Sequence, residues 1–203
     1  MLEIALASQS PRRRELLLQA GFQFRVFPVK VSEIIDENLT PAEAASQLAT
    51  DKAQAAISEH NELKTKGFLV LSADTIVVLG QRILGKPQNF SDAQQFLRSL
   101  SGKTHSVITG VTLIESGSTK VWTGAEKTEV KFRILSEKEI SDYVSTGEPM
   151  DKAGAYAIQG GGGKFVSSCT GSWSNVVGLP LERLESVLKQ NGWTVRRRTP
   201  EKS

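Results

Sequence analysis

Three consecutive arginines, at positions 12–14, stand where the first turn of a helix normally carries acids. Ser10 and Pro11 form an N-cap and N1 pair directly after an apolar run, so the arginines fall at the start of a predicted helix. Cations at this end of the helix dipole each cost about 0.3–1 kcal/mol, whereas a bound anion would reverse the sign. With the hydroxyls of Ser8 and Ser10 and the free backbone N–H groups, they predict a phosphate-binding site. The alternative is a solvated basic face.

A lysine lies on the apolar face of the next predicted helix. That helix begins after Thr40, and its apolar stripe includes Leu48, Ala49 and Ala56, which are three or four residues from Lys52. Residues at this spacing share one face of a helix, so we expect Lys52 to point inward or along the wall of a cleft. Lys52 either extends past the core to water or, if it converges with the arginines, provides a second phosphate ligand.

An acid follows an apolar run of strand length. Residues 68–73 are predicted to form a strand buried on both faces, which ends at Asp74 and Thr75. Active sites of open α/β sheets gather at the carboxyl ends of strands. A carboxylate there could bind Mg²⁺ or activate a water, and the alternative is an aspartate that caps a turn. Glu33, after the strand-like residues 24–31, is a second candidate acid.

The elements that must position these residues alternate between strand-length apolar runs and segments of helical periodicity. Strands are expected at residues 2–7, 68–73, 76–79, 106–113 and 120–132. Helices are expected to begin at Pro11 and after Thr40, Ser91 and Ser136, and a last helix ends at Asn191. This order predicts an α/β fold with a mixed sheet flanked by helices. No linker divides the chain, so we expect a single domain over residues 1–195, followed by a basic C-terminal tail at 196–203.

Composition limits the class of function. The 203 residues include 25 Lys and Arg against 22 Asp and Glu, and a net charge of +3 does not require a nucleic-acid partner. The single cysteine, Cys169, cannot form an internal disulfide, which indicates a reducing cytoplasm. No stretch approaches the roughly 20 apolar residues of a membrane span.

Two further motifs carry no predicted chemistry. His105 is not at metal-ligand spacing from the other histidine, so no zinc site is expected. The glycine run 160–163 is interpreted as a mobile loop or a tight turn.

Six blocks of the sequence, taken in order, resemble the signature blocks of the Maf family of nucleoside triphosphate pyrophosphatases, once described as septum-formation inhibitors. The resemblance spans nearly the whole chain. The blocks are Ala7–Arg13, Ser72–Thr75, Gly85–Pro87, Leu100–Lys103 with His105–Gly110, Asp151–Gly160 and Asn175–Pro180.

The resemblance implies an elongated α/β fold related to inosine triphosphate pyrophosphatases, with a cleft between two lobes. It also implies hydrolysis of a nucleoside triphosphate between the α and β phosphates with a divalent cation, Mg²⁺ or Mn²⁺. In this interpretation Asp74 is the proton acceptor, and Glu33 and Asp74 hold the metal. The candidate substrate contacts are Ser8, Ser10, Arg12, Arg13, Lys52, Thr75, Lys86, Lys152 and Gln159.

The block Asp151–Gly160 resembles that of family members that prefer dTTP and UTP, and Arg12, Thr75 and Gln159 match positions associated with this preference. A glutamine amide offers a donor and an acceptor, so it can pair with the edge of uracil or thymine. One alternative is the same chemistry on 7-methyl-GTP or on purine or non-canonical nucleotides. The other alternative is a protein that binds nucleic acid or a partner in cell division. The expected partner is a small-molecule nucleotide, and no association with a membrane is expected. Family members are often homodimers, so a homodimer is possible.

Overall fold

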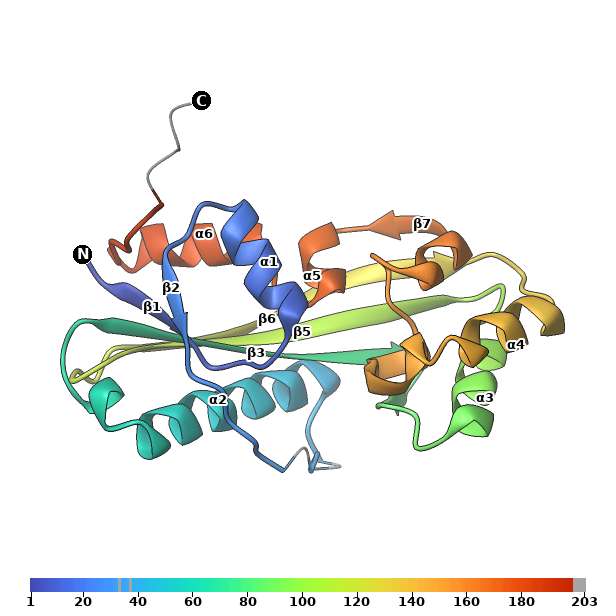
Figure 1. Ribbon diagram of the computed structural model, residues 1–203, viewed down its shortest axis with the longest axis horizontal. Coiled ribbons are helices and arrows are strands. Elements are labelled where there is room, and N and C mark those ends of the chain that lie inside the picture. The colour runs from blue at the N-terminus through green and yellow to red at the C-terminus, as the bar shows by residue number, and fades with distance from the viewer. Residues whose placement is uncertain (33, 37, 199–203) are drawn as a thin grey trace. The chain divides into compact units, whose positions relative to one another are not determined.

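The computed structural model describes residues 1–32, 34–36 and 38–198, which alternate between strands and helices (Figure 1). The chain divides into two compact units, each built from separate stretches of sequence. Unit 1 contains residues 1–74, 109–126 and those from 178 onward, and unit 2 contains residues 75–108 and 127–177. Three long strands contribute residues to both units: β3 (Phe68–Leu79), β5 (Thr104–Glu115) and β6 (Val121–Phe132).

The strands of unit 1 follow the order β2-β1-β3-β5-β6. Strand β1 (Glu3–Leu6) pairs in parallel with β2 (Phe24–Val26) on one side and with β3 on the other. Strand β2 ends before the predicted residue 31, because Pro28 has no N–H group to continue the ladder.

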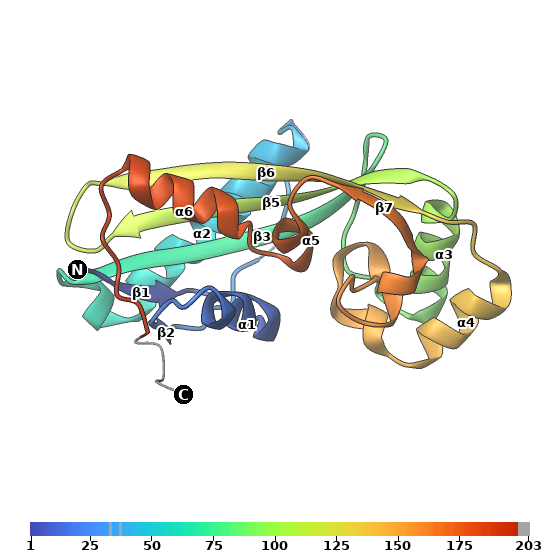
Figure 2. The ribbon, with the colours of Figure 1, turned by 90° about the horizontal axis from the view of Figure 1, so that it is seen from above.

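Helices cover both faces of the unit 1 sheet. Helices α1 (Pro11–Gln19) and α6 (Leu181–Gln190) lie on one face, and α2 (Pro41–Glu59) lies on the other (Figures 1 and 2). A 3-10 turn at Asn61–Lys64 follows α2. The core on the α2 side is built mostly from small residues, which let the helix approach the strands closely: Ala5, Ala7, Phe27, Ala53, Ala56, Leu63 and Val70.

Helix α2 is fixed on the sheet by hydroxyl contacts and by a glycine. Ser72 of β3 donates a hydrogen bond to the carbonyl of Ala49 at 2.6 Å. Thr50 shares a hydrogen bond of 2.9 Å with Thr112 of β5. A Cβ placed on Gly110 of β5 would lie 2.1 Å from the carbonyl oxygen of Ala45, so α2 and β5 meet backbone to backbone.

The chain after α6 returns to the N-terminal strands. The N–H of Arg196 donates to the carbonyl of Leu2 at 2.9 Å. The guanidinium of Arg197 lies 3.6 Å from the centre of the Phe22 ring and forms an ion pair with Glu185 at 2.7 Å. The first residues of the predicted tail are therefore hydrogen-bonded and packed within unit 1.

Unit 2 combines parts of the three long strands with short elements. Strand β4 (Arg82–Leu84) pairs antiparallel with β3, and β7 (Val166–Thr170) pairs antiparallel with β6. Helices α3 (Phe90–Leu100) and α4 (Glu137–Ser145) pack against each other (Figure 2). The remaining elements are helix α5 (Trp173–Val177) and 3-10 turns at Glu148–Asp151, Ala153–Ala155 and Gly161–Phe165.

The predicted mixed α/β fold is confirmed, with two local corrections. Strand β3 does not end at Asp74 but continues to Leu79, because residues 77–79 pair with β4. The Asp74 carboxylate contacts a lysine on α2 and does not cap a turn. Helix α3 begins at Phe90 instead of after Ser91. Its N-cap is Asn89, whose side chain accepts a hydrogen bond from the N–H of Asp92 at 2.9 Å.

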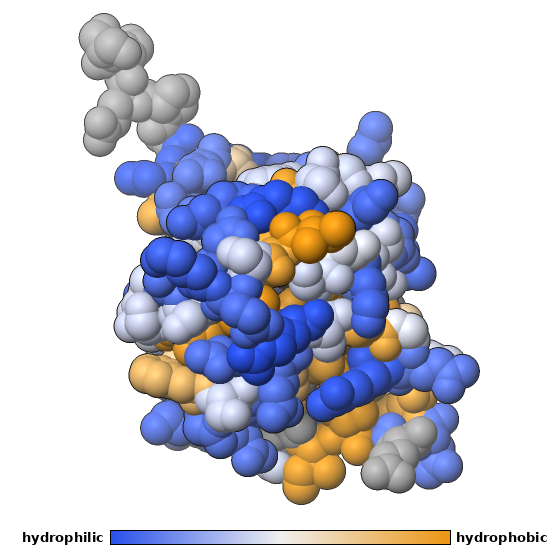
Figure 3. Space-filling model, turned by 90° about the vertical axis from the view of Figure 1, so that its right-hand side faces the viewer, coloured by the Kyte–Doolittle hydropathy of each residue, from blue (hydrophilic) through white to orange (hydrophobic). Residues whose placement is uncertain are grey.

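The exposed surface carries few large apolar side chains. In unit 2 the most exposed are Phe90, Ile134 and Trp173. On the face shown in Figure 3, apolar patches are separated by hydrophilic side chains. Among the described residues, no helix has the length and apolar character needed to cross a membrane.

We expect Gly110→Ala to lower the free energy of unfolding by about 2 kcal/mol or more, because the added methyl group has no space against the α2 backbone. The matched control is Gly85→Ala, where a Cβ would meet nothing within 4 Å. Urea denaturation of both variants would measure the difference. Equal stability of the two variants would contradict the close approach of α2 and β5.

A buried histidine belongs to the aromatic cluster of unit 2. His105 is 2% exposed, and its Nε2 lies 2.8 Å from the hydroxyl of Tyr156. Its ring packs edge-on against those of Phe132 and Tyr156. Burial lowers the pKa of His105 from 6.5 to about 4, although Glu129 acts in the opposite direction. The side chain is therefore a neutral structural group.

This shift predicts how stability depends on pH. The folded pKa lies below the unfolded value, so the stabilising contribution of neutral His105 is complete above pH 6.5 and decreases as the pH falls toward 4. Between about pH 7.5 and 5 we expect the wild type to lose about 2 kcal/mol more than His105→Gln. Urea denaturation at the two pH values tests this, and parallel losses in both proteins would contradict it.

Candidate active site

The start of helix α1 is organised around Arg13. The N-cap is Ser10, as predicted, and its Oγ accepts from the N–H of Arg13 at 3.4 Å. The buried Ser8 Oγ accepts from the N–H of Ser10 at 3.2 Å and from Arg13 Nη1 at 3.1 Å. Arg13 Nε donates to the carbonyl of Gly178 at 2.7 Å. The guanidinium is thus held from two sides within unit 1.

These contacts leave the helix start suited to an anion. Ser8 and Ser10 act as acceptors here, so each retains a hydroxyl proton that can be donated. Arg12 is half-buried in the same turn, and no acid stands in that turn. The first turn combines the positive end of the helix dipole with fixed guanidinium groups, which is the arrangement that binds phosphate.

Lys52 and Asp74 form a largely buried ion pair. Lys52 Nζ on α2 contacts Asp74 Oδ1 on β3, and the two side chains are 14% and 10% exposed. The prediction that Lys52 points inward is confirmed. A pair taken this far from water gains little net stability, because desolvation offsets most of the attraction, so stability alone does not account for it.

The contact between Lys52 and Asp74 depends on the position of helix α2 along strand β3. The Ser72 hydroxyl, two residues before Asp74, holds the carbonyl of Ala49, three residues before Lys52. Helix and strand are therefore in fixed register where the two charged side chains meet.

The remaining candidates that the structure describes lie in unit 2. Gly154 N–H donates to the carbonyl of Gly85 at 3.0 Å, so the segments that carry Lys86 and Lys152 are adjacent. Lys86 is exposed, whereas Lys152 is 12% exposed and forms an ion pair with Asp151.

The segment after Lys152 bends through two left-handed residues. Gly154 has φ 68° and Ala155 has φ 58°. A Cβ at Gly154 would lie 2.9 Å from a methyl carbon of Val77, so only glycine fits. A left-handed alanine is strained by about 1 kcal/mol, and strain of this kind persists where the surroundings determine the conformation.

Gln159 and Thr75 complete the described candidates. Gln159 is exposed on a turn closed by a hydrogen bond of 3.1 Å from the N–H of Gly160 to the carbonyl of Ala157. Thr75 is half-buried and follows Asp74 directly on β3. Glu33 lies outside the described residues.

Sequence reasoning missed two partners of the predicted residues. The carbonyl of Gly178 holds Arg13, and Asp151 pairs with Lys152. Both lie within the signature blocks, and the positive φ of Gly178, 124°, explains the glycine there. The contact with Arg13 joins residues 165 positions apart, so no local pattern could have predicted it.

Comparison with known proteins finds relatives over nearly the whole chain. The model of the Maf-like protein family matches residues 3–191. A dTTP/UTP pyrophosphatase of Bdellovibrio bacteriovorus is 48% identical over 187 residues, which cover 92% of this chain and 97% of that protein. A dTTP/UTP pyrophosphatase of Pelotomaculum thermopropionicum is 48% identical over 195 residues, covering 96% and 100%. Among solved structures, the Ham1 protein of Staphylococcus aureus matches with a TM-score of 0.47 and 13% identity, covering 93% of this chain and 98% of that one.

Proposed function

Because the chain belongs to the Maf family, we propose that it hydrolyses dTTP and UTP to the nucleoside monophosphate and pyrophosphate. The observation that carries this proposal is the largely buried Lys52–Asp74 pair, a carboxylate and an ammonium held in fixed register within one unit. The names of the relatives, which cover more than nine-tenths of the chain, support the same reaction and substrates.

In this proposal the cationic groups bind the triphosphate. The N–H groups at the start of α1, the hydroxyls of Ser8 and Ser10, and the guanidiniums of Arg12 and Arg13 neutralise phosphate oxygens. The hydrogen bonds that fix Arg13 reduce the entropy lost on binding, because its side chain is already ordered.

Asp74 is the proposed general base. It orients a water and accepts its proton as the water attacks the α-phosphorus, while the bond to the leaving pyrophosphate breaks. Lys52 fixes the carboxylate before substrate arrives, and its ammonium then interacts with phosphate oxygens as well. Most of the acceleration comes from positioning and from neutralising the charge that develops on the leaving group.

A divalent cation, Mg²⁺ or Mn²⁺, is the proposed cofactor. Asp74 supplies one carboxylate, and the described residues contain no cluster of three ligating side chains. One or two carboxylates with substrate phosphates and waters suit Mg²⁺, which rarely uses an all-protein cage. When bound, the cation would neutralise charge on the phosphates. Glu33 remains the predicted second ligand.

The candidate residues of unit 2 keep the substrate-binding roles that the family resemblance implies. Lys86 and Lys152 lie on adjacent segments and are assigned to phosphate oxygens. Gln159 is assigned to recognition of the pyrimidine, because its amide can donate and accept at the uracil or thymine edge. Thr75 and Arg12 stay predicted determinants of the same preference, as the resemblance implies. The proposed compartment is the cytoplasm, as the single cysteine indicates. A homodimer stays a prediction.

The alternative of a nucleic-acid-binding protein has less support than the enzyme. In the arginine cluster at residues 196–198, Arg197 pairs with Glu185 and packs on the Phe22 ring. That guanidinium is therefore engaged in intramolecular contacts. A nucleic-acid surface needs guanidiniums that can reach phosphates along a strand.

A substrate panel tests the proposed function. With Mg²⁺ present, we expect pyrophosphate release from dTTP and UTP with a kcat/KM at least about tenfold above that for purine triphosphates and 7-methyl-GTP, because the Gln159 amide is assigned to a pyrimidine edge. A higher kcat/KM for 7-methyl-GTP or a purine triphosphate would assign the same chemistry to another base.

Asp74→Asn tests the catalytic assignment. This change keeps the side-chain shape and removes the proton acceptor, so we expect kcat for dTTP to fall about 100-fold or more. The control is Asp142→Asn, which neutralises an exposed carboxylate that pairs with Lys138 on α4 and should leave kcat within about twofold. Wild-type turnover by a folded Asp74→Asn protein would show that another group activates the water.

A further inference from the structure

The glycine run 160–163 is packed against two side chains of unit 2. A Cβ on Gly160 would lie 2.1 Å from Glu148 Oε1, and one on Gly162 would lie 3.0 Å from the hydroxyl oxygen of Tyr143. Side chains at positions 160–162 would collide with Tyr143 or Glu148, and one at Gly163 would collide with the carbonyl of Ile158. Close packing therefore accounts for the glycines, and a 3-10 turn is formed by Gly161–Phe165.

Tyr143 and Glu148 also bind the backbone of this segment. The Tyr143 hydroxyl donates to Glu148 Oε1 at 2.9 Å and accepts from the N–H of Ala157 at 3.1 Å. Glu148 Oε2 accepts from the N–H of Gly161 at 3.1 Å. Ala157 and Gly161 stand two residues before and two residues after Gln159. The Tyr143–Glu148 pair therefore holds both ends of the five-residue turn that displays the Gln159 amide.

The Tyr143 side chain is fixed by the core around it. Tyr143 is 4% exposed, and its ring packs edge-on against Phe165 with 5.1 Å between ring centres. Burial, with Glu148 as hydrogen-bond acceptor, raises the pKa of Tyr143, so its hydroxyl remains a donor at neutral pH.

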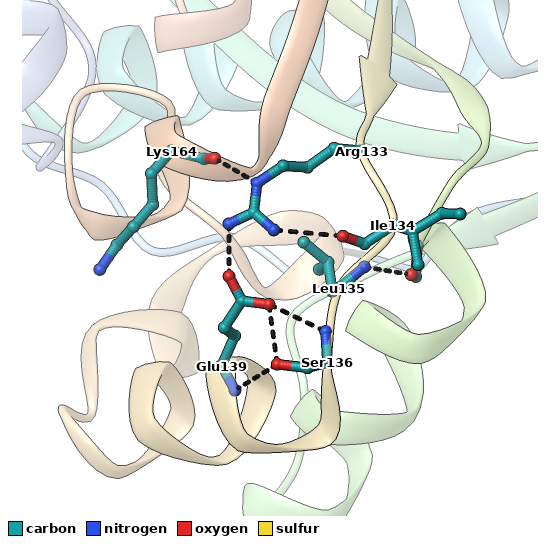
Figure 4. A network of polar contacts seen from close by, with 7 residues as sticks. Arg133, Ile134, Leu135, Ser136, Glu139 and Lys164 are labelled. Carbon is teal, nitrogen blue, oxygen red and sulfur yellow. Dashed lines mark hydrogen bonds and ion pairs between the residues drawn. The ribbon is translucent and has the colours of Figure 1, made fainter.

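The 3-10 turn Gly161–Phe165, which follows the Gln159 turn, is also held at its other end by Arg133. Arg133 Nε donates to the carbonyl of Lys164 at 3.0 Å, and its Nη2 pairs with Glu139 at 2.6 Å (Figure 4). Glu139 in turn accepts from the N–H and hydroxyl of Ser136, the N-cap of α4. The 3-10 turn at Gly161–Phe165 is thus anchored at both ends, which leaves little freedom to the backbone beside Gln159.

We propose that Tyr143 and Glu148 are positioning residues for pyrimidine recognition, which act by holding the Gln159 turn. This inference rests on the proposed function, in which Gln159 reads the base. A glutamine side chain has several rotatable bonds, so the reach of its exposed amide depends on a backbone that does not shift. Neither residue touches the reacting phosphates in this assignment, so the effect belongs to base selection and not to the chemical step.

Tyr143→Phe tests the inference, because it keeps the ring against Phe165 and removes only the hydroxyl that joins Ala157 to Glu148. We expect KM for dTTP to rise about five- to tenfold with kcat within about twofold, and KM for dATP to remain within about twofold. Discrimination for dTTP over dATP then falls by the same factor. A residue that merely stabilised the fold would not change this ratio.

Tyr156→Phe is the matched control. It also removes a hydroxyl from a buried tyrosine of unit 2, but that hydroxyl bonds His105 instead of the turn backbone. We expect it to lower the melting temperature by an amount similar to that of Tyr143→Phe and to leave discrimination unchanged. Amide hydrogen exchange should accelerate at Ala157 and Gly161 in Tyr143→Phe and not in the control.

Gln159→Ala separates the inference from the proposed function. If Gln159→Ala lowers discrimination, the double variant with Tyr143→Phe should lower it no further, because the tyrosine acts through the glutamine. Additive losses, or unchanged discrimination in Tyr143→Phe alone, would overturn the inference and leave the role of Gln159 standing. Unchanged discrimination in Gln159→Ala would overturn both.

Discussion

Helix α2 lies so close to strand β5 that one methyl group would not fit between their backbones at Gly110. This contact sets the depth at which α2 sits on the sheet. The small residues along the helix, among them Ala45, Ala49 and Ala53, permit that depth, and the Ser72 hydroxyl fixes the helix along its axis. Lys52 reaches Asp74 on β3 because the helix is held this close. The charged pair is thus a consequence of backbone packing, and loss of the packing would separate the charges without any change in either residue.

Much of the site could be predicted from sequence because its signals are local. Ser10 before Pro11 defines a helix start through hydrogen bonds within four residues, and the structure has this N-cap. The spacing of Lys52 from its apolar neighbours likewise fixes the face on which it lies. In both cases the geometry of a single helix determines the outcome, so the sequence carries the information directly.

Other features could not be predicted because they depend on contacts distant in sequence. An acid after an apolar run normally ends a strand, but Asp74 lies within one, since its partner comes from another element. Arg13 is held by the carbonyl of Gly178, and no pattern around either residue indicates this. The reason for four successive glycines at 160–163 is not local either, because Tyr143 and Glu148 occupy the space beside them.

The two units are completed at different times while the chain is synthesised. Unit 2 ends at residue 177, whereas unit 1 includes residues 178 onward. The Gly178 carbonyl binds Arg13, and the N–H of Arg196 donates to Leu2 beside the first strand. Every residue of unit 2 is therefore synthesised before the segment whose Gly178 carbonyl binds Arg13 at the start of α1. The nascent chain can fold unit 2 before the unit that carries Lys52 and Asp74 is finished, and Arg13 acquires its Gly178 partner only after the whole of unit 2 has been made.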